Sequence, residues 1–167
     1  SGKEADAQIM AFEDTWHWTQ SAEATYHELL MQADDVSKMI EAFRSFIGTN
    51  QMMAYLVMMT ARLVELHRVL KPTGSLYLHC DPTASHYLKI LLDTIFGALN
   101  YRSEIIWKRT SSHNSAKRFG PIHDTIFFYS KSDAFVWNKV FQAYDADYVE
   151  TFYRHWENGK RYQLVDL

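Results

Sequence analysis

Four side chains near the middle of the chain could take part in chemistry: His79, Cys80, Asp81 and His86. They could bind a metal ion, or Cys80 could act as a nucleophile with a histidine as its base. Adjacent residues of a strand point to opposite faces, so His79 and Cys80 cannot easily share one metal, and no two-histidine or paired-cysteine spacing is present. We therefore expect no metal site and a buried, unreactive Cys80, with Asp81 as a helix cap.

A second group of residues is basic. Lys108, Arg109, Lys117 and Arg118 lie in a stretch without acids, although the formal net charge of the whole chain is −3. That net charge argues against a general nucleic-acid-binding surface, but a local basic segment has two interpretations. It is either a solvated surface loop or a contact for phosphates. No glycine-rich phosphate loop and no Gly-x-Ser-x-Gly motif is present, so the residues alone do not indicate a reaction.

Helices and strands alternate around these residues. Two short amphipathic helices are predicted within residues 24–47, the second capped by Asp34 or Asp35 and ended by Gly48. A longer helix begins after Asn50 and ends before Pro72, and its apolar stripe is expected to face a sheet. That stripe consists of Met52, Leu56, Met59, Leu63, Leu66 and Leu70. Before these helices, we expect a loop that packs its aromatic residues, Phe12, Trp16 and Trp18.

The second half of the chain predicts three strands and one helix. The strands cover residues 75–80, 104–107 and 125–129, and the helix runs from Asp81, with Pro82 in its first position, to Gly97. Further on, Asn158 and Gly159 predict a turn between two short strands. The alternation of helices and strands indicates an incomplete α/β domain. In such domains ligands bind beyond the carboxyl ends of the strands, and His79, Cys80 and Asp81 lie at one such end.

Composition supports one buried core. The chain has 167 residues, 47% of them hydrophobic, and its longest apolar run, residues 52–59, is well short of the roughly 18 residues that a membrane span needs. The first twenty residues lack the order of a secretory signal, and a single cysteine agrees with a reducing compartment. We expect a cytoplasmic protein.

Several continuous segments of the sequence resemble motifs of the bacterial DNA adenine-N6 and cytosine-N4 methyltransferases. The resemblance is carried by ARLVELHRVLKPTGSLYLHCDPTASHYLK at residues 61–89, LLDTIFG at 91–97, SEIIWKR at 103–109 and HDTIFFYSK at 123–131. FEDTW at residues 12–16 is similar to the aromatic segment that follows the family's catalytic tetrapeptide. The order of these segments resembles the beta arrangement of the family, in which the catalytic motif comes first and the cofactor motif last.

The resemblance implies an incomplete Rossmann-like methyltransferase sheet with flanking helices. Residues 1–138 would be part of the catalytic domain, with a helical segment at about 21–47, and residues 139–167 would begin the target-recognition region. The family's Asp-Pro-Pro-Tyr or Asp-Pro-Pro-Phe tetrapeptide and its glycine-rich cofactor loop are absent from these residues. We therefore expect an inactive central fragment and assign it no catalytic residue.

For the intact parent, the resemblance implies transfer of a methyl group from S-adenosylmethionine to the exocyclic amine of a flipped base. Adenine N6 is the preferred target because the motifs are closest to those of the adenine enzymes. It places His79 and Asp81 on the cofactor side and the basic segment, Lys108, Arg109, Lys117 and Arg118, beside duplex DNA. A second copy of the chain or a restriction subunit are candidate partners, and no membrane partner is expected. There are two alternative functions. One is a non-catalytic DNA-binding or assembly module, and the other is a methyltransferase that acts on RNA or a small molecule.

Overall fold

The computed structural model describes residues 16–109, 114–115, 117–119, 121–141 and 143–164. The chain divides into two compact units, Ser1–Val136 and Trp137–Leu167. The first unit contains helices and a sheet, a mixed α/β architecture in agreement with the predicted fold class. No helix among the described residues is long and apolar enough to cross a membrane.

Three helices open the first unit, and side chains cap each of them. They are α1 (Gln20–Met31), α2 (Asp35–Ile47) and α3 (Gln51–Val69). The predicted caps are confirmed for α2, which Asp34 begins and Gly48 ends, and for α3, which Asn50 begins. Each cap side chain accepts a backbone N–H of the first turn, which would otherwise lack a partner. Thr19 caps α1 in the same way.

The apolar stripe of α3 differs in part from the prediction. Leu56 and Leu63 are fully buried, and Met52, Met59 and Leu70 pack against the core, but Leu66 is 47% exposed. The buried positions that the stripe missed are Met53, Ala54, Val57 and Thr60. The physical reason is that α3 contacts α1, α2 and α4, so neighbours cover it from several sides and its buried face is wider than a stripe facing only a sheet.

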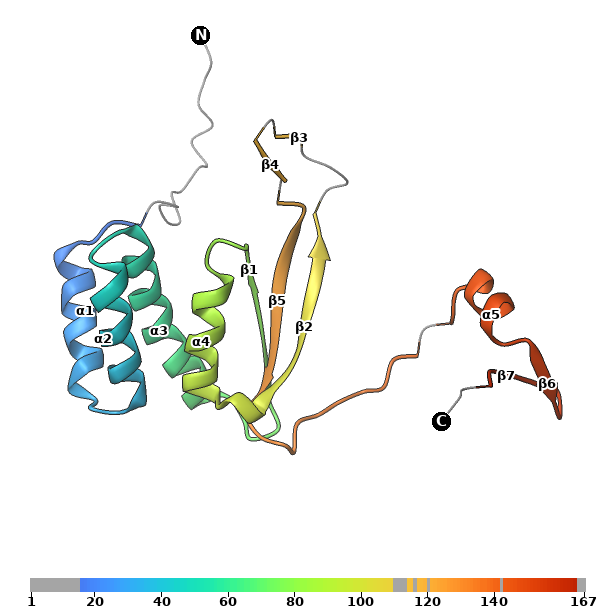
Figure 1. Ribbon diagram of the computed structural model, residues 1–167. Helices are drawn as coiled ribbons and strands as arrows, with labels where there is room; N and C mark the ends of the chain where they lie inside the picture. Colours follow the sequence, from blue (N-terminus) through green and yellow to red (C-terminus); the bar gives the residue numbers. More distant parts are fainter. Residues whose placement is uncertain (1–15, 110–113, 116, 120, 142, 165–167) are drawn as a thin grey trace, which may run out of the picture. The chain divides into compact units, whose positions relative to one another are not determined.

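The sheet has three strands in the order β1-β5-β2 (Figure 1). These strands are β1 (Ser75–Cys80), β2 (Tyr101–Lys108) and β5 (His123–Ser130). Both β1 and β2 pair antiparallel to β5, so they run in the same direction on either side of it. The chain passes from β1 to β2 through helix α4 (Ser85–Phe96) and the short 3-10 helix η1 (Ala98–Asn100), and from β2 to β5 through the hairpin of β3 (Asn114–Ser115) and β4 (Arg118–Phe119).

The two faces of the sheet have different surroundings. On one face Leu78, Phe127 and Tyr129 pack with Leu88 and Leu91 of α4 in the core, and Figure 1 shows the helices gathered on this side. The alternation predicted for β1 is confirmed, because Leu76, Leu78 and Cys80 lie toward the core whereas Tyr77 and His79 are exposed. By the pleat of the strands, the opposite face carries Tyr77, His79, Ile105, Trp107 and Asp124.

The start of α4 corrects the prediction that Asp81 caps it directly. The helix begins at Ser85, and its N-cap residue, Ala84, makes no capping bond through its side chain. The Asp81 carboxylate instead accepts the backbone N–H groups of Thr83 and Ala84, at 3.0 and 3.3 Å. Asp81 therefore closes a turn that leads into the helix, because aspartate bonds its own backbone two residues on as readily as it caps. Gly97 ends α4 as predicted.

The second unit is small, and its clearest predicted feature is confirmed. Strands β6 (His155–Glu157) and β7 (Lys160–Tyr162) form a hairpin around Asn158 and Gly159. Both turn residues have positive φ, 50° and 77°, which asparagine and glycine tolerate best. The preceding helix α5 (Ala146–Phe152) was not predicted. Tyr144, just before the helix, stacks on Tyr148, and the Tyr148 ring lies 4.8 Å from the Phe152 ring at an angle of 41°.

Candidate functional site

A cavity of about 450 Å³ lies at the carboxyl end of β1. It is lined by residues from the first loop, the first turns of α3 and the turn after β1: Trp16, Gln51, Met52, Tyr55, Cys80, Asp81, Thr83 and Ala84. This is the end of a strand at which a ligand was expected, and the size lies within the range of small-molecule sites. The lining combines flat aromatic walls with one carboxylate.

Two aromatic side chains form one wall of the cavity. The Trp16 and Tyr55 rings lie 5.6 Å apart between centroids at an angle of 57°. Burial raises the pKa of Tyr55, and the neighbouring Cys80 and Asp81 raise it further, so the phenol keeps its proton at neutral pH. The wall can therefore stack on a flat ring and also donate a hydrogen bond. The expectation that Trp16 and Trp18 pack is confirmed, whereas Phe12 lies outside the described residues.

Asp81 supplies the carboxylate of the cavity. Its Oδ1 atom holds the turn through Thr83 and Ala84, and the described part of the chain offers no hydrogen bond to Oδ2. The side chain is exposed and lines the cavity. A carboxylate oxygen in this position can accept two hydroxyl hydrogen bonds or face a cation.

Cys80 also lines the cavity but lacks the character of a nucleophile. Burial raises the pKa of its thiol to about 12, with the charges of Asp81, Asp124 and Glu104 adding to the effect. The thiolate, which is the reactive form, is therefore scarce at neutral pH. Within the described ranges, no three His, Cys, Asp or Glu side chains form a group that could hold a metal ion.

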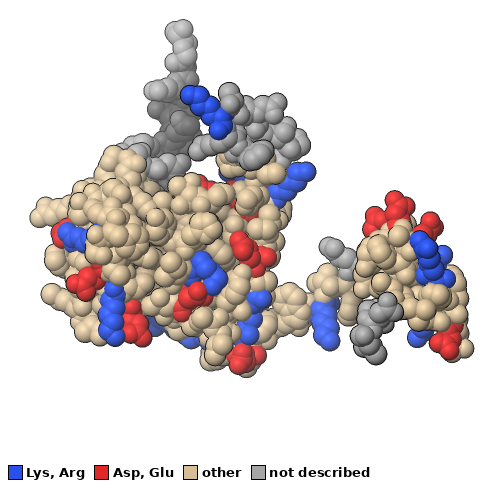
Figure 2. Space-filling view, viewed as in Figure 1, with Lys and Arg blue, Asp and Glu red and all other residues tan. Residues whose placement is uncertain are grey.

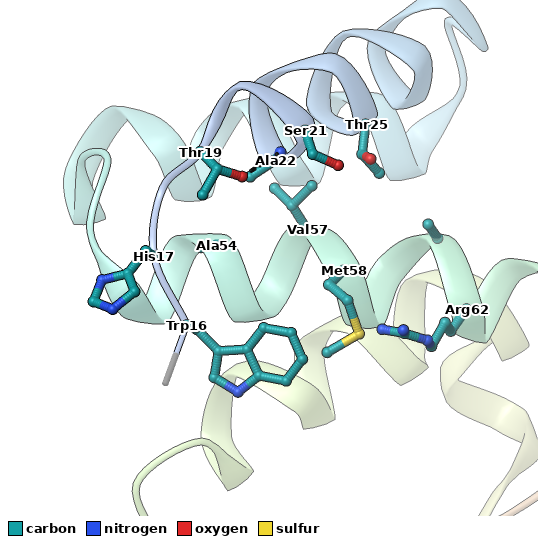
Figure 3. A pocket seen from close by; sticks show the side chains of 11 residues that line it. Trp16, His17, Thr19, Ser21, Ala22, Thr25, Ala54, Val57, Met58 and Arg62 are labelled. Atoms are coloured by element: carbon teal, nitrogen blue, oxygen red, sulfur yellow. Dashed lines mark hydrogen bonds between the residues drawn. The ribbon is translucent and has the colours of Figure 1, made fainter. Parts of the chain in front are cut away.

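A second cavity of about 350 Å³ lies between α1 and α3, and Trp16 lines this cavity as well (Figure 3). Figure 3 shows the Trp16 indole beside Met58, with Arg62 one turn further along α3 and Thr19, Ser21 and Thr25 on the α1 side. The indole thus contributes to both cavities. Small residues such as Ala54 line the rest of this groove.

His79 and Asp81, predicted together on the cofactor side, lie on different surfaces. Asp81 lines the first cavity, whereas His79 projects from the opposite face of the sheet with 60% of its side chain exposed. Its Nε2 atom lies 3.0 Å from Oδ2 of Asp124, which belongs to β5. The other oxygen of Asp124, Oδ1, accepts a hydrogen bond from Nη1 of Arg109 at 3.1 Å. His79, Asp124 and Arg109 form what we call the Asp124 cluster.

The basic residues lie at the same end of the sheet as the first cavity. Lys108 ends β2 opposite His123, and Thr125, two residues along β5, pairs with Cys80. Arg109 follows with a half-exposed side chain, Lys117 lies exposed between β3 and β4, and Arg118 begins β4. Figure 2 shows Lys and Arg side chains at this end of the first unit.

Sequence reasoning missed Tyr55 and Asp124. Tyr55 was read only as part of an apolar run on a helix, and nothing in its spacing sets it apart. Asp124 carried a usable signal, because it is an acid directly before the apolar strand predicted at Thr125 to Tyr129. An acid in such a position is buried with the strand, and a buried acid is usually paired with a charged or hydrogen-bonding partner. The partner residues could not be found in this way, because they come from other strands.

Comparisons with known proteins agree with the resemblance. A family model for N6/N4 methyltransferases, described as DNA methylase, matches residues 11–164. Over 115 residues the chain is 32% identical to the Type II methyltransferase M.EcaI of Enterobacter cloacae, covering 68% of this chain and 25% of that protein.

Two further relatives align over 85 residues each. The Type II methyltransferase M.KpnI of Klebsiella pneumoniae is 34% identical, covering 50% of this chain and 20% of the relative. The Type III restriction-modification enzyme EcoP15I Mod subunit of Escherichia coli is 25% identical, covering 51% and 13%. The chain thus spans a quarter or less of the length of these relatives.

Proposed function

Because this chain belongs to the N6/N4 DNA methylase family, we propose that the intact protein methylates an exocyclic amine of duplex DNA, with adenine N6 as its target. The observation that carries the proposal is the family match along residues 11–164, which includes the cavity, the Asp124 cluster and the basic segment. Adenine is preferred over cytosine N4 because the motifs of this chain as a whole resemble those of the adenine enzymes more closely.

The residues of the first cavity fit the methyl donor that the family implies, S-adenosylmethionine. This cofactor combines a flat purine, ribose hydroxyls and a cationic sulfonium, and when bound it supplies an electrophilic methyl group. Trp16 and Tyr55 would stack on a flat or cationic group, and Asp81 would accept hydroxyl hydrogen bonds or face the positive charge. Contact of His79 with the cofactor stays a prediction, since its ring lies on the other face of the sheet.

For the DNA side, we assign Lys108, Arg109, Lys117 and Arg118 to phosphate contacts. Two features support this assignment: Lys108 ends β2 and the other three residues follow it without an intervening acid, and the end of β2 shares one end of the sheet with the cavity. A base reaching the cavity would then have its backbone close to these cations. Residues 139–167 are assigned to the start of the target-recognition region. The similarity to a Type III Mod subunit suggests a restriction subunit as a partner, with a second copy as the alternative.

The 167 residues by themselves are expected to transfer no methyl group and to bind S-adenosylmethionine poorly. The reason is that the tetrapeptide that would hold the amine and the glycine-rich loop that would hold the cofactor are absent from them. Isothermal titration calorimetry of this chain with S-adenosylmethionine tests the claim. Tight, saturable binding, or transfer of tritiated methyl groups to DNA by this chain alone, would contradict it.

The proposed activity is tested on the intact protein with tritiated S-adenosylmethionine and with duplex DNA or RNA as acceptor. Digestion of the product to nucleosides should yield the nucleoside of N6-methyladenine. Detection of N4-methylcytosine instead would show that the target base is cytosine. Asp81→Asn should raise the KM for the cofactor, whereas Asp35→Asn, an exposed acid on α2, should not change it. DNA binding without any transfer would instead support a non-catalytic module, and transfer only to RNA would support the RNA alternative.

A further inference from the structure

Asp124 is a buried acid on β5 that contacts both neighbouring segments of the sheet. Only 9% of its side chain is exposed, and its oxygens contact two segments, Oδ2 with His79 of β1 and Oδ1 with Arg109, the residue directly after β2. Arg109 is also held through its backbone, since its N–H donates to the carbonyl of Ile122 at 2.8 Å. Both the main chain and the side chain of Arg109 are therefore attached to β5 and the residue before it.

The charge state of Asp124 follows from these contacts. Burial alone raises the pKa of its carboxyl, but the hydrogen bonds from His79 and Arg109 together outweigh that effect, and the net pKa is lowered. The group is thus an ionised carboxylate at neutral pH. A buried carboxylate is tolerated in proteins when donors satisfy its oxygens, and the guanidinium of Arg109 does so with a full positive charge.

Arg109 differs in this respect from the other basic residues of the segment. Among the described residues, neither Lys108 nor Lys117 forms an ion pair, and both are exposed. Arg109 gives one nitrogen to Asp124 and remains 52% exposed, so its planar fork still presents donors to solvent. A side chain that is already ordered loses less conformational entropy when it binds an anion.

We propose that Asp124 is a positioning residue that holds the Arg109 guanidinium in place for a phosphate of the bound DNA. The inference rests on the proposed function, because it assumes that the basic segment faces DNA. The proposal predicts that removing the Asp124 charge changes the affinity for DNA in the direction opposite to that expected from charge repulsion alone. An acid beside a phosphate-binding surface repels DNA, so its removal should tighten binding if it is a bystander and weaken binding if it positions Arg109.

The test measures the affinity of the intact protein for duplex DNA by fluorescence anisotropy at several salt concentrations. Asp124→Asn removes the charge and nearly preserves the shape, and it should weaken binding by about 3- to 10-fold, in the net range of one typical hydrogen bond. The control is Asp133→Asn, which removes an exposed acid whose pair with Arg102, 2.8 Å between Nη2 and Oδ1, belongs to neither the Asp124 cluster nor the basic segment. That control should leave the affinity unchanged or slightly increased.

A double-mutant cycle separates positioning from general stabilisation. Arg109→Ala should weaken binding by about 10-fold, and adding Asp124→Asn to it should cause no further loss, because the positioned group is gone. Arg109→Lys retains the charge without the planar fork and should also weaken binding, which keeps the test available if an Asp124 variant does not fold. In methylation assays, Asp124→Asn should raise the KM for DNA and leave kcat at saturating DNA nearly unchanged.

Three results would overturn the inference. The first is tighter binding by Asp124→Asn with a steeper salt dependence, and the second is an equal loss from Asp124→Asn with and without Arg109. The third is unchanged affinity of Arg109→Lys and Arg109→Ala while Lys108→Ala and Lys117→Ala still weaken binding. In each case the proposed function survives. Failure of the wild-type protein to bind duplex DNA at all would instead remove the proposed function, and the inference with it.

Discussion

The two faces of the three-stranded sheet carry opposite kinds of chemistry although they alternate along the same strands. On the face toward α3 and α4, Phe127 and Tyr129 are buried in an apolar core. On the other face, Ile105 and Trp107 are 41% and 59% exposed, and the polar Asp124 cluster lies beside them. The comparison teaches that most of the buried apolar side chains of the sheet lie on one face, while the other face, apart from the buried Phe128, and the strand ends hold the charged groups assigned to function.

The largest expected effect is on the stability of the core face. Phe127→Ala removes a side chain packed between the sheet and α4 and should lower the free energy of unfolding by about 3–5 kcal/mol. Ile105→Ala, on the other face of the neighbouring strand, should lower it by about 1 kcal/mol or less, because the side chain is partly in solvent already. Urea denaturation followed by circular dichroism measures both. Equal losses would mean that the two faces are equally packed.

The next effect concerns two adjacent residues on opposite faces, Cys80 and His79. With a pKa of about 12 in place of 9.0, the Cys80 thiol should react with iodoacetamide at pH 7–8 about 1000-fold more slowly than an unperturbed cysteine, since thiolate is the reactive form. The His79 ring, with 60% of its side chain exposed, should be accessible to diethyl pyrocarbonate in the folded chain. Peptide mapping by mass spectrometry reads both rates, and urea-unfolded protein is the control. Rapid alkylation of the folded chain would refute the burial of Cys80.

A smaller effect is expected at the basic end of the sheet. Replacing Lys108, Arg109, Lys117 and Arg118 by alanine in the intact protein should flatten the dependence of log K on log salt by up to about 3 to 4 units, at roughly 0.9 per phosphate contact. Phosphate contacts position rather than specify, so the loss should be similar on recognised and random duplexes. An unchanged slope would make this segment a solvated loop, and a loss confined to the recognised sequence would mean that one side chain reads a base edge.

The smallest effect is the pH dependence of the Asp124 cluster. Because the folded pKa of Asp124 is lower than its ordinary value of 3.8, the cluster stabilises the fold fully above that value and loses the contribution as the pH falls through the folded pKa. The difference in unfolding free energy between wild type and Asp124→Asn should therefore shrink as the pH falls below about 4. Asp133→Asn, at an exposed position, provides the comparison. A difference that grows toward acid pH would contradict the assigned direction.

Local features of the chain were predictable because the forces that set them are local. Asp34 and Asn50 at the starts of α2 and α3, Gly48 and Gly97 at helix ends, and the Asn158–Gly159 turn act through bonds and torsions within a few residues. The alternation of β1 was predictable in the same way, since the pleat is a property of a single strand. Family membership was also readable, because runs of residues carry it without reference to contacts.

The tertiary structure alone decided which distant residues meet. The insertion of β5 between β1 and β2 places Asp124 against His79 and Arg109, 45 and 15 positions away, and no periodicity encodes such pairings. The same holds for the cavity, where Trp16, Tyr55 and Asp81 come from three separate segments. It also holds for Leu66, which is exposed although it fits the helical stripe. Burial depends on the neighbours that pack around a residue, and a sequence pattern describes only the side chains that a segment offers.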